Sequence, residues 1–275
     1  MHESNFERNL EEVRLILDIA LERFNASSFI ARDPISIPHR FSRKEDIEIS
    51  GFLIALIAWG NRASILKSGH RLMQMMDDSP YHFVVSASDN ELNKLKNFIH
   101  RTLNGQDILY MIKILRLIYE NKIGLEEIFS RNIQQNDITI AHGIRALHAE
   151  FFPDKGKVLK RCMKHLPNID KGSAAKRINM FLRWMVRKDK AGVDFGIWDF
   201  PRPSQLVCPL DVHSGRTARL LGLLTRKQND WKAALELTEN LKLLCPEDPI
   251  KYDLALFGLG TDPEFRDLLL QTNSH

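Results

Sequence analysis

Residues 166–222 contain two helix starts that decide the fold, one on each side of a connection rich in glycine and proline. The first is LPNIDKGSAAKRINMFLRW at 166–184, where a Leu-Pro turn precedes a basic amphipathic helix. The second is CPLDVHSGRTARLLG at 208–222, where Asp211 precedes an apolar helical pattern. Aspartate is a preferred N-cap residue, so the second segment predicts a helix that begins after Asp211. Together the two starts can hold a lysine and an aspartate against a shared pocket.

Apolar residues recur at helical spacing through most of the chain. No stretch alternates with period two for long enough to predict a sheet, so we expect an all-α fold of about a dozen helices. A nearly all-apolar segment that ends near Gly60 predicts a buried central helix. The predicted helical segments outside 166–222 are 4–25, 46–58, 64–76, 91–103, 106–120, 125–131, 138–152 and, within 230–260, two helices divided at Cys245-Pro246.

The composition is that of a globular protein. The chain has 275 residues, of which 44% are hydrophobic and 27% charged. No apolar run approaches the roughly 20 residues that a membrane span needs, and the N-terminus is too charged for a signal peptide, so we expect a cytoplasmic protein without a membrane partner. Cys162, Cys208 and Cys245 are far apart and fit no metal or iron–sulfur spacing. We expect neither a metal nor a cofactor.

Positive charge is concentrated in one part of the sequence. The formal net charge is +4, yet residues 155–190 carry 12 Lys/Arg and 2 acidic residues, a local charge of +10. Phe181 and Trp184 lie among these charges. Such a stretch favours binding to a phosphate backbone. The alternative is an ordinary solvated helix face.

Two residues of 166–222 could carry chemistry. Lys176 shares a helix face with Asn179, Met180 and Arg183, and a lysine held against apolar walls becomes a nucleophile. Its alternative role is a phosphate contact or a solvated charge, and Lys171, at the turn, is a rival nucleophile. Asp211 is either an N-cap alone or a rigidly held general base or electrostatic stabiliser.

Three motifs resemble one family. LPNIDKGSAAK at 166–176 is similar to the hairpin L-P-G-V-G-x-K-T-A of helix-hairpin-helix DNA glycosylases of the endonuclease III superfamily. PLDVHSGRTARLLGL at 209–223 is similar to their V-D-V-H-x-x-R segment, and LIALIAWGNRAS at 53–64 to their early buried helix, L-I-A-x-x-L-S-x-Q-x-T. The matches follow the family's order between about residues 50 and 260. The chain is most like an uncharacterised bacterial family of this superfamily, known only by a domain-of-unknown-function label and related to archaeal 8-oxoguanine DNA glycosylase.

The resemblance implies a two-lobed helical fold with a cleft between the lobes. The whole chain, 1–275, would form one glycosylase-like unit with lobes at 45–160 and 161–225. The segments 1–44 and 226–275 would pack back across both lobes.

Departures from the family pattern bear on the nucleophile. Asn168 and Asp170 replace the hairpin glycines, and Gly172 stands where the usual catalytic lysine falls. Lys176 precedes Asp211 by 35 residues, which is similar to the archaeal 8-oxoguanine branch, so we prefer Lys176 to Lys171.

The resemblance therefore implies a DNA repair glycosylase, with AP lyase activity, that excises an oxidised purine such as 8-oxoguanine from damaged duplex DNA. Lys176 and Asp211 would be catalytic. The implied base pocket consists of Asn61, Met180, Arg183, Asp253 and Phe257. The implied contacts to the DNA backbone are Lys155, Lys157, Lys160, Arg161, Lys164 and Lys171. One alternative is a non-catalytic nucleic-acid-binding protein on the same scaffold, and another is a helical protein whose basic strip binds an acidic partner. No particular protein partner is implied.

Overall fold

The computed structural model describes residues 2–121, 123–153, 161–263 and 265. The α-helices are α1 (His2–Phe24), α2 (Ser27–Ile30), α3 (Lys44–Ile57), α4 (Arg62–Met75), α5 (Pro80–Ser86), α6 (Asp89–Lys94), α7 (Gly105–Glu120), α8 (Leu125–Asn132), α9 (Ala141–Phe151), α10 (Lys176–Val186), α11 (Val212–Leu220), α12 (Trp231–Leu244) and α13 (Asp253–Thr261). The 3₁₀ turns and strands are η1 (Pro34–Ser36), η2 (Pro38–Arg40), η3 (Leu95–Asn97), β1 (Ile99–His100), β2 (Leu103–Asn104), η4 (Cys162–His165), η5 (Ile169–Lys171), η6 (Pro203–Gln205) and η7 (Pro249–Tyr252). The predicted all-α fold is confirmed.

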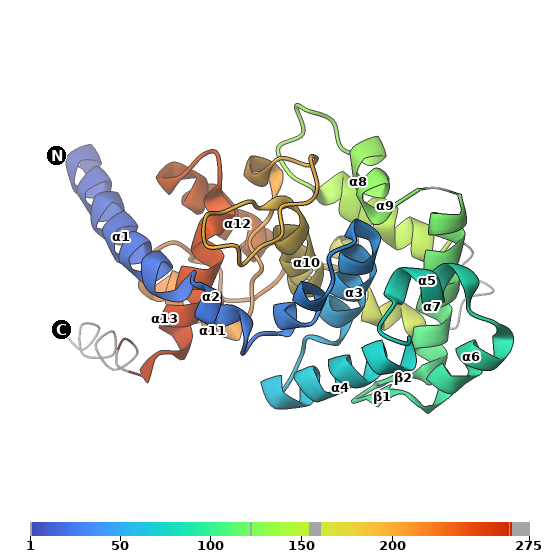
Figure 1. Cartoon of the computed structure of the whole chain (residues 1–275). Helices are drawn as coiled ribbons and strands as arrows, with labels where there is room; N and C mark the ends of the chain where they lie inside the picture. Colours follow the sequence, from blue (N-terminus) through green and yellow to red (C-terminus); the bar gives the residue numbers. More distant parts are fainter. Residues whose placement is uncertain (1, 122, 154–160, 264, 266–275) are drawn as a thin grey trace.

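Helix α3 is the centre of the fold. Every residue from Ile47 to Ile57 is buried, as expected for a helix that is apolar on all sides. Helix α10 packs directly against α3. Figure 1 shows this pair between α4–α9 on one side and α1, α11, α12 and α13 on the other. Helix α3 ends, and helix α10 begins, at the site described below.

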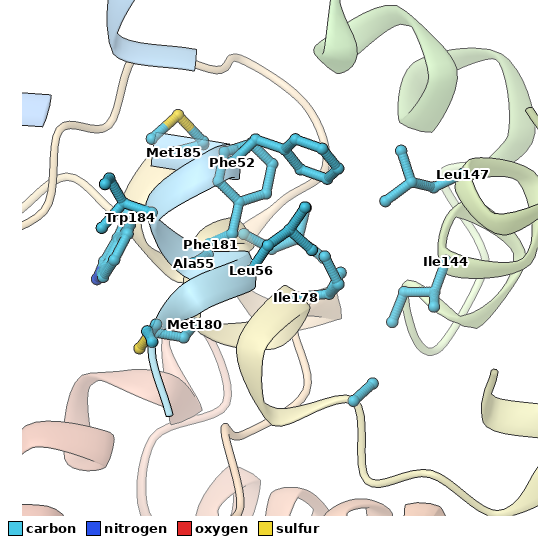
Figure 2. Packing of buried hydrophobic residues seen from close by; sticks show 14 of the residues in the cluster. Phe52, Ala55, Leu56, Ile144, Leu147, Ile178, Met180, Phe181, Trp184 and Met185 are labelled. Carbon is cyan, nitrogen blue, oxygen red and sulfur yellow. The ribbon is translucent and has the colours of Figure 1, made fainter. Parts of the chain in front are cut away.

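The contact between α3 and α10 is made by a glycine and aromatic rings. Gly51 leaves room for Met185, whose Cε would lie 3.1 Å from a Cβ at that position. The Phe52 ring lies 5.8 Å from that of Phe181 on α10 and 5.1 Å from that of Phe151 on α9. Figure 2 shows the Phe52 and Phe181 rings among aliphatic side chains of α3 and α10, such as Leu56 and Ile178. The packing fixes where α10 begins relative to the end of α3.

A buried carboxylate joins two other parts of the chain to α3. Glu48 is 2% exposed and accepts hydrogen bonds from the Tyr119 hydroxyl of α7 at 2.6 Å and from Trp198 Nε1 at 2.7 Å. Burial raises the pKa of Glu48, although these two donors act in the opposite direction. Trp198 belongs to the connection between α10 and α11, so Glu48 holds that connection in place.

The predicted helix at 91–103 is wrong. Helix α6 ends at Lys94, and a short antiparallel hairpin follows, in which Ile99 pairs with Asn104 and His100 with Leu103. The physical reason lies in Asn104, which stands between the predicted segments 91–103 and 106–120. Its side chain accepts from the backbone N–H groups of Gln106 and Asp107, so Asn104 must be extended to cap α7. Local capping therefore outweighs the apolar spacing before it.

The predicted lobes at 45–160 and 161–225 remain a prediction. Within the residues described, none of the helices has the length and apolar content to cross a membrane.

The central packing can be tested with Phe52→Ala. Because Phe52 is fully buried between two other rings, we expect the free energy of unfolding to fall by about 3–5 kcal/mol. Chemical denaturation followed by circular dichroism measures the change. The matched control is Ile99→Ala, whose side chain is 64% exposed and whose loss should change stability by about 0.5 kcal/mol or less. Equal effects of the two substitutions would contradict the packing described.

Candidate active site

An open cavity of about 600 Å³ lies where the end of α3 and the beginnings of α4, α10 and α11 meet α13. A smaller inner pocket of about 50 Å³ adjoins it and shares five of its lining residues. The shared residues are Asp33, Lys176, Met180, Asp211 and Phe257. The inner pocket is further lined by Arg183, Ser214 and Asp253. Phe29, Pro209 and Leu254 complete its lining, so the inner pocket combines charged groups with apolar walls.

Asp211 is fixed by the helix that it caps. Its Oδ1 accepts from the backbone N–H groups of His213 at 2.8 Å and Ser214 at 3.0 Å, and its own N–H donates to the Ser214 hydroxyl at 3.0 Å. The predicted N-cap is confirmed. Because Oδ1 is committed to α11, Oδ2 is left to face the cavity.

Lys176 meets Asp211 across the cavity. Lys176 Nζ lies 3.7 Å from Asp211 Oδ2, and the two side chains are 30% and 23% exposed. Lys176 is the first residue of α10, and the preceding Ala175 has left-handed backbone geometry with φ of 52°. This turn carries the chain into α10 without a side-chain cap.

The beginning of α10 is electrostatically unfavourable. The N-terminus of a helix carries partial positive charge and favours carboxylates, yet the first turn of α10 contains Lys176 and Arg177 and no acidic residue. Arg177 donates to the backbone carbonyls of Leu56 and His165, and burial lowers the pKa of Arg177 to about 10. Two cations at this position cost stability, and such local conflicts are typical of functional sites.

Buried ion pairs form the back wall of the inner pocket. Arg183 donates from Nη1 to Asp253 Oδ2 and from Nε to Asp194 Oδ1, the second at 3.1 Å. Arg187 also donates to Asp194 and reaches Asp248. Burial opposes the charge of Arg183, but Asp194 and Asp253 outweigh it and raise its pKa. Burial raises the pKa of Asp253 to about 6 against the opposing effects of Arg183 and Lys176.

An aromatic ring forms one side of the cavity. Phe257 on α13 is partly exposed, and the His213 ring meets its edge with centroids 6.0 Å apart. The Arg62 guanidinium carbon lies 5.6 Å from the centroid of Phe257. Phe257 and Asp253 are one helical turn apart, so both face the same space.

Most of the residues predicted for the site lie together. Those that line the outer cavity, the inner pocket or both are Lys176, Asp211, Met180, Arg183, Asp253 and Phe257. Asn61 is exposed and caps α4 through a 3.2 Å bond from Ser64 N–H, and it does not line either space. Lys171 is exposed on η5 and also lies outside both.

The predicted phosphate contacts are scattered. Lys155, Lys157 and Lys160 lie outside the described residues. Arg161 donates both Nε and Nη2 to the buried carboxylate of Asp107, at 3.1 and 3.0 Å. Lys164 is exposed, as is Lys171.

Within the described part of 155–190, several of the charged and aromatic side chains do not lie on one basic surface. Arg183 and Arg187 are buried in ion pairs, and Arg177 is bound to backbone carbonyls. Phe181 and Trp184 have no exposed surface and cannot lie among phosphate contacts. Sequence charge counts treat every arginine alike, whereas burial removes several of these from the surface.

Asp33 and Arg62 were missed in the sequence. Asp33 lines both spaces, accepts a 3.1 Å bond from Ile35 N–H and has a pKa raised by burial. The available signal was the Asp33-Pro34 pair, which is typical of a capped turn. Arg62 follows Asn61, which the family resemblance placed in the base pocket, but no signal pointed to Arg62 itself.

The fold and cavity thus define an all-α protein with a lysine–aspartate site. The chain belongs to the family described as "Protein of unknown function (DUF2400)", whose model matches residues 33–262. This range includes Lys176, Asp211 and Asp253, and it confirms the expected membership of a family of unknown function. No curated protein and no solved structure matches the chain.

The two roles of Asp211 can be separated by substitution. Asp211→Ala removes the cap of α11 and should lower the free energy of unfolding by about 1 kcal/mol. Asp211→Asn keeps a capping oxygen and removes only the charge that faces Lys176, so its stability should stay close to that of the wild type. Urea denaturation measures both. A loss in Asp211→Asn as large as that in Asp211→Ala would show that the ion pair, and not the cap, stabilises this region.

The pKa of Asp253 predicts a pH-dependent stability. Because folding raises this pKa from an ordinary value near 3.8 to about 6, the folded state binds the proton more tightly. The resulting stabilisation is complete at low pH and is lost as the pH rises through about 6. Between pH 4 and 6, wild type should lose about 2 kcal/mol relative to Asp253→Asn. Denaturant midpoints at several pH values measure this, and parallel curves would contradict the raised pKa.

Proposed function

We propose that this chain is a DNA glycosylase with AP lyase activity, acting on an oxidised purine such as 8-oxoguanine in duplex DNA. The observation that carries the proposal is the 3.7 Å separation of Lys176 Nζ and Asp211 Oδ2 at the shared wall of the cavity and the inner pocket. Lys176 is the proposed nucleophile, and Asp211 is the proposed proton acceptor and electrostatic stabiliser.

The proposed reaction uses both groups in turn. Asp211 accepts a proton from the Lys176 ammonium, and the freed electron pair of Nζ forms a bond to C1′ of the sugar. The C1′–base bond breaks, and its electron pair leaves with the base, which takes up a proton. The C1′-bound Nζ then loses a second proton through Asp211. Opening of the C1′–O4′ bond gives a protonated C=N Schiff base, and O4′ takes up that second proton, while the proton first accepted by Asp211 goes to the base. Positive charge that develops on the sugar is stabilised by the nearby Asp211 carboxylate.

The position of Lys176 supports a chemical role. Lys176 is the first residue of α10 and lines the cavity. Its Nζ lies 3.7 Å from Asp211 Oδ2, so the amine has a proton acceptor beside it at the place where a bound sugar would lie.

The inner pocket supports recognition of an extruded base. Taking a base out of the stack costs a few kcal/mol, which stacking and hydrogen bonding in a pocket must offset. Phe257 offers a partly exposed ring, and Asp253 with Arg183 offers buried polar groups on the adjacent turn. Asp33 provides a second carboxyl group in the same space.

The same ion pair also favours a second candidate, a non-catalytic nucleic-acid-binding protein. An ammonium group that stays paired with Asp211 joins α10 to α11 and performs no covalent chemistry. The hairpin departs from the glycosylase pattern as well, since Asp170 is held by Arg145 at 2.8 Å. The two candidates differ in whether Lys176 forms a bond to DNA.

Borohydride trapping separates them. We expect wild type, incubated with duplex DNA containing 8-oxoguanine and with borohydride, to form a covalent adduct that migrates slowly on a denaturing gel. Lys176→Ala should form none, because the proposed nucleophile is absent. Asp211→Asn should reduce the trapping rate by about 100-fold or more, as expected for loss of an electrostatic stabiliser.

The controls separate the nucleophile from the binding of DNA. Lys171→Ala, assayed at saturating DNA, should still form the adduct, since Lys171 lies outside the cavity. Lys176→Ala should still bind the same duplex in a gel-shift assay. If wild type binds DNA but forms no adduct across a panel of oxidised bases and abasic sites, the second candidate is correct.

A further inference from the structure

Helix α4 and the hairpin beside it carry positive charge without any acidic residue. From Gly60 to Met76 the sequence contains Arg62, Lys67 and Arg71 and neither Asp nor Glu. All three side chains are exposed. The β1–β2 hairpin adds the exposed Arg101 at its turn. This set of four residues, Arg62, Lys67, Arg71 and Arg101, is called the α4 surface below.

Aromatic rings position the two arginines nearest the cavity. The guanidinium carbon of Arg101 lies 4.5 Å from the Trp59 ring centroid, and that of Arg62 lies 5.6 Å from the Phe257 centroid. Gly60 allows this approach, because a Cβ there would come within 2.1 Å of Arg101 Nη1. Trp59, Gly60 and Phe257 all line the outer cavity, so the two guanidinium groups lie at its mouth.

These two guanidinium groups are available to a ligand. Neither Arg62 nor Arg101 forms a hydrogen bond or ion pair with another residue in the part of the chain that the structure describes. A guanidinium stacked on a ring keeps its N–H groups free at the edge, where they can bind a phosphate through two oxygens. By contrast, Arg161 and Arg183 donate hydrogen bonds from their N–H groups to carboxylates within the protein.

The hairpin and α4 are held together, which fixes the spacing of the cations. Arg71 Nη2 donates to the Asn97 carbonyl at 3.0 Å, and His100 Nδ1 lies 2.9 Å from the Ser68 hydroxyl. Arg71 keeps further N–H groups beyond this bond. From Arg62 to Arg71 the helix rises about 14 Å and turns by about 180°, so Arg71 starts from the opposite side of α4 to Arg62.

We propose that the α4 surface is the main phosphodiester-binding surface of this protein, with Arg62 and Arg101 gripping the backbone on either side of the nucleotide at the cavity mouth. Lys67 and Arg71 add positive charge farther along α4. This inference rests on the proposed function, because it takes duplex DNA as the partner. It moves the DNA contact away from 155–190, whose arginines in the described part of the chain serve the interior.

The test measures the salt dependence of DNA binding. Fluorescence anisotropy is recorded with a labelled duplex that carries a central tetrahydrofuran abasic-site analogue, which cannot form a Schiff base. Arg62→Ala/Arg101→Ala should weaken binding at least 10-fold at moderate salt and lower the slope of log K against log salt by about 2, since each lost phosphate contact lowers it by about 0.9. Lys67→Ala/Arg71→Ala should lower the slope similarly.

A matched control comes from an arginine elsewhere. Arg131→Ala removes an equally exposed guanidinium on α8, which lies far from α4 in Figure 1, and should leave both affinity and slope unchanged. Arg62→Lys/Arg101→Lys keeps the charge and should retain most of the slope while losing affinity, because an ammonium cannot bind phosphate through two N–H groups in one plane. Circular dichroism and the unfolding midpoint confirm that each variant folds.

The outcomes distinguish this inference from the proposed function. If wild type binds the duplex and both double variants match it in slope, the α4 surface is not the phosphate-binding surface, while the glycosylase proposal still stands on trapping. If wild type binds no duplex, both proposals fail. Binding of phosphatidylserine vesicles through the same arginines, without binding to the duplex, would also overturn the inference in favour of a membrane surface.

Discussion

The hydrogen bonds of Arg177 connect the core to the site. Helix α3 is buried along its length, so the carbonyl groups at its C-terminal end lack water as a partner. Arg177 donates to one of them, on Leu56, and also to the carbonyl of His165, just before the hairpin turn. Because Arg177 follows Lys176 directly, the end of α3 and the beginning of α10 are set by one guanidinium. The place of the lysine therefore follows from satisfying buried backbone groups.

A second arginine, Arg183, fixes the wall of the inner pocket behind Lys176. Arg183 lies two turns along α10 from Lys176, and its bonds to Asp253 and Asp194 join α10 to α13 and to the connection that follows α10. Such buried pairs need good geometry to offset desolvation, and breaking one leaves an unpaired buried charge. These ion pairs therefore fix the positions of α10, α13 and the connection after α10 relative to one another more than they add net stability. Burial is also the reason that Asp253 has a raised pKa although it contacts an arginine.

Much of the helical architecture could be predicted from the sequence, but the cations beside the cavity could not. The apolar run before Gly60 and the Asp211 cap are local signals, and both act as expected, because burial and capping depend on few neighbours. The grouping of Lys176, Asp211, Asp253 and Phe257 was predicted through a family resemblance, since spacing alone does not bring α10 and α13 together. The Asp33-Pro34 pair indicates a capped turn but not a cavity, and Arg101 gave no signal, because tertiary contacts bring Asp33 to the cavity and Arg101 to the Trp59 ring beside it. The helix predicted over 91–103 failed where the capping of α7 required extended backbone.

The arginines show why charge in the sequence is a poor guide to a binding surface. Arg183 and Arg187 contribute to the +10 of residues 155–190, yet each is enclosed by carboxylates. Arg62 and Arg101 belong to segments of modest charge, yet both are exposed and each contacts an aromatic ring. A guanidinium that already binds a carboxylate gains little from a phosphate, because one strong partner replaces another. A guanidinium stacked on a ring keeps its hydrogen-bonding capacity and loses little rotamer freedom on binding. The strength of a phosphate contact therefore depends on the hydrogen bonds and rotamer freedom that the cation loses on binding. By this criterion, phosphate should bind more strongly at the mouth of the cavity than along residues 155–190.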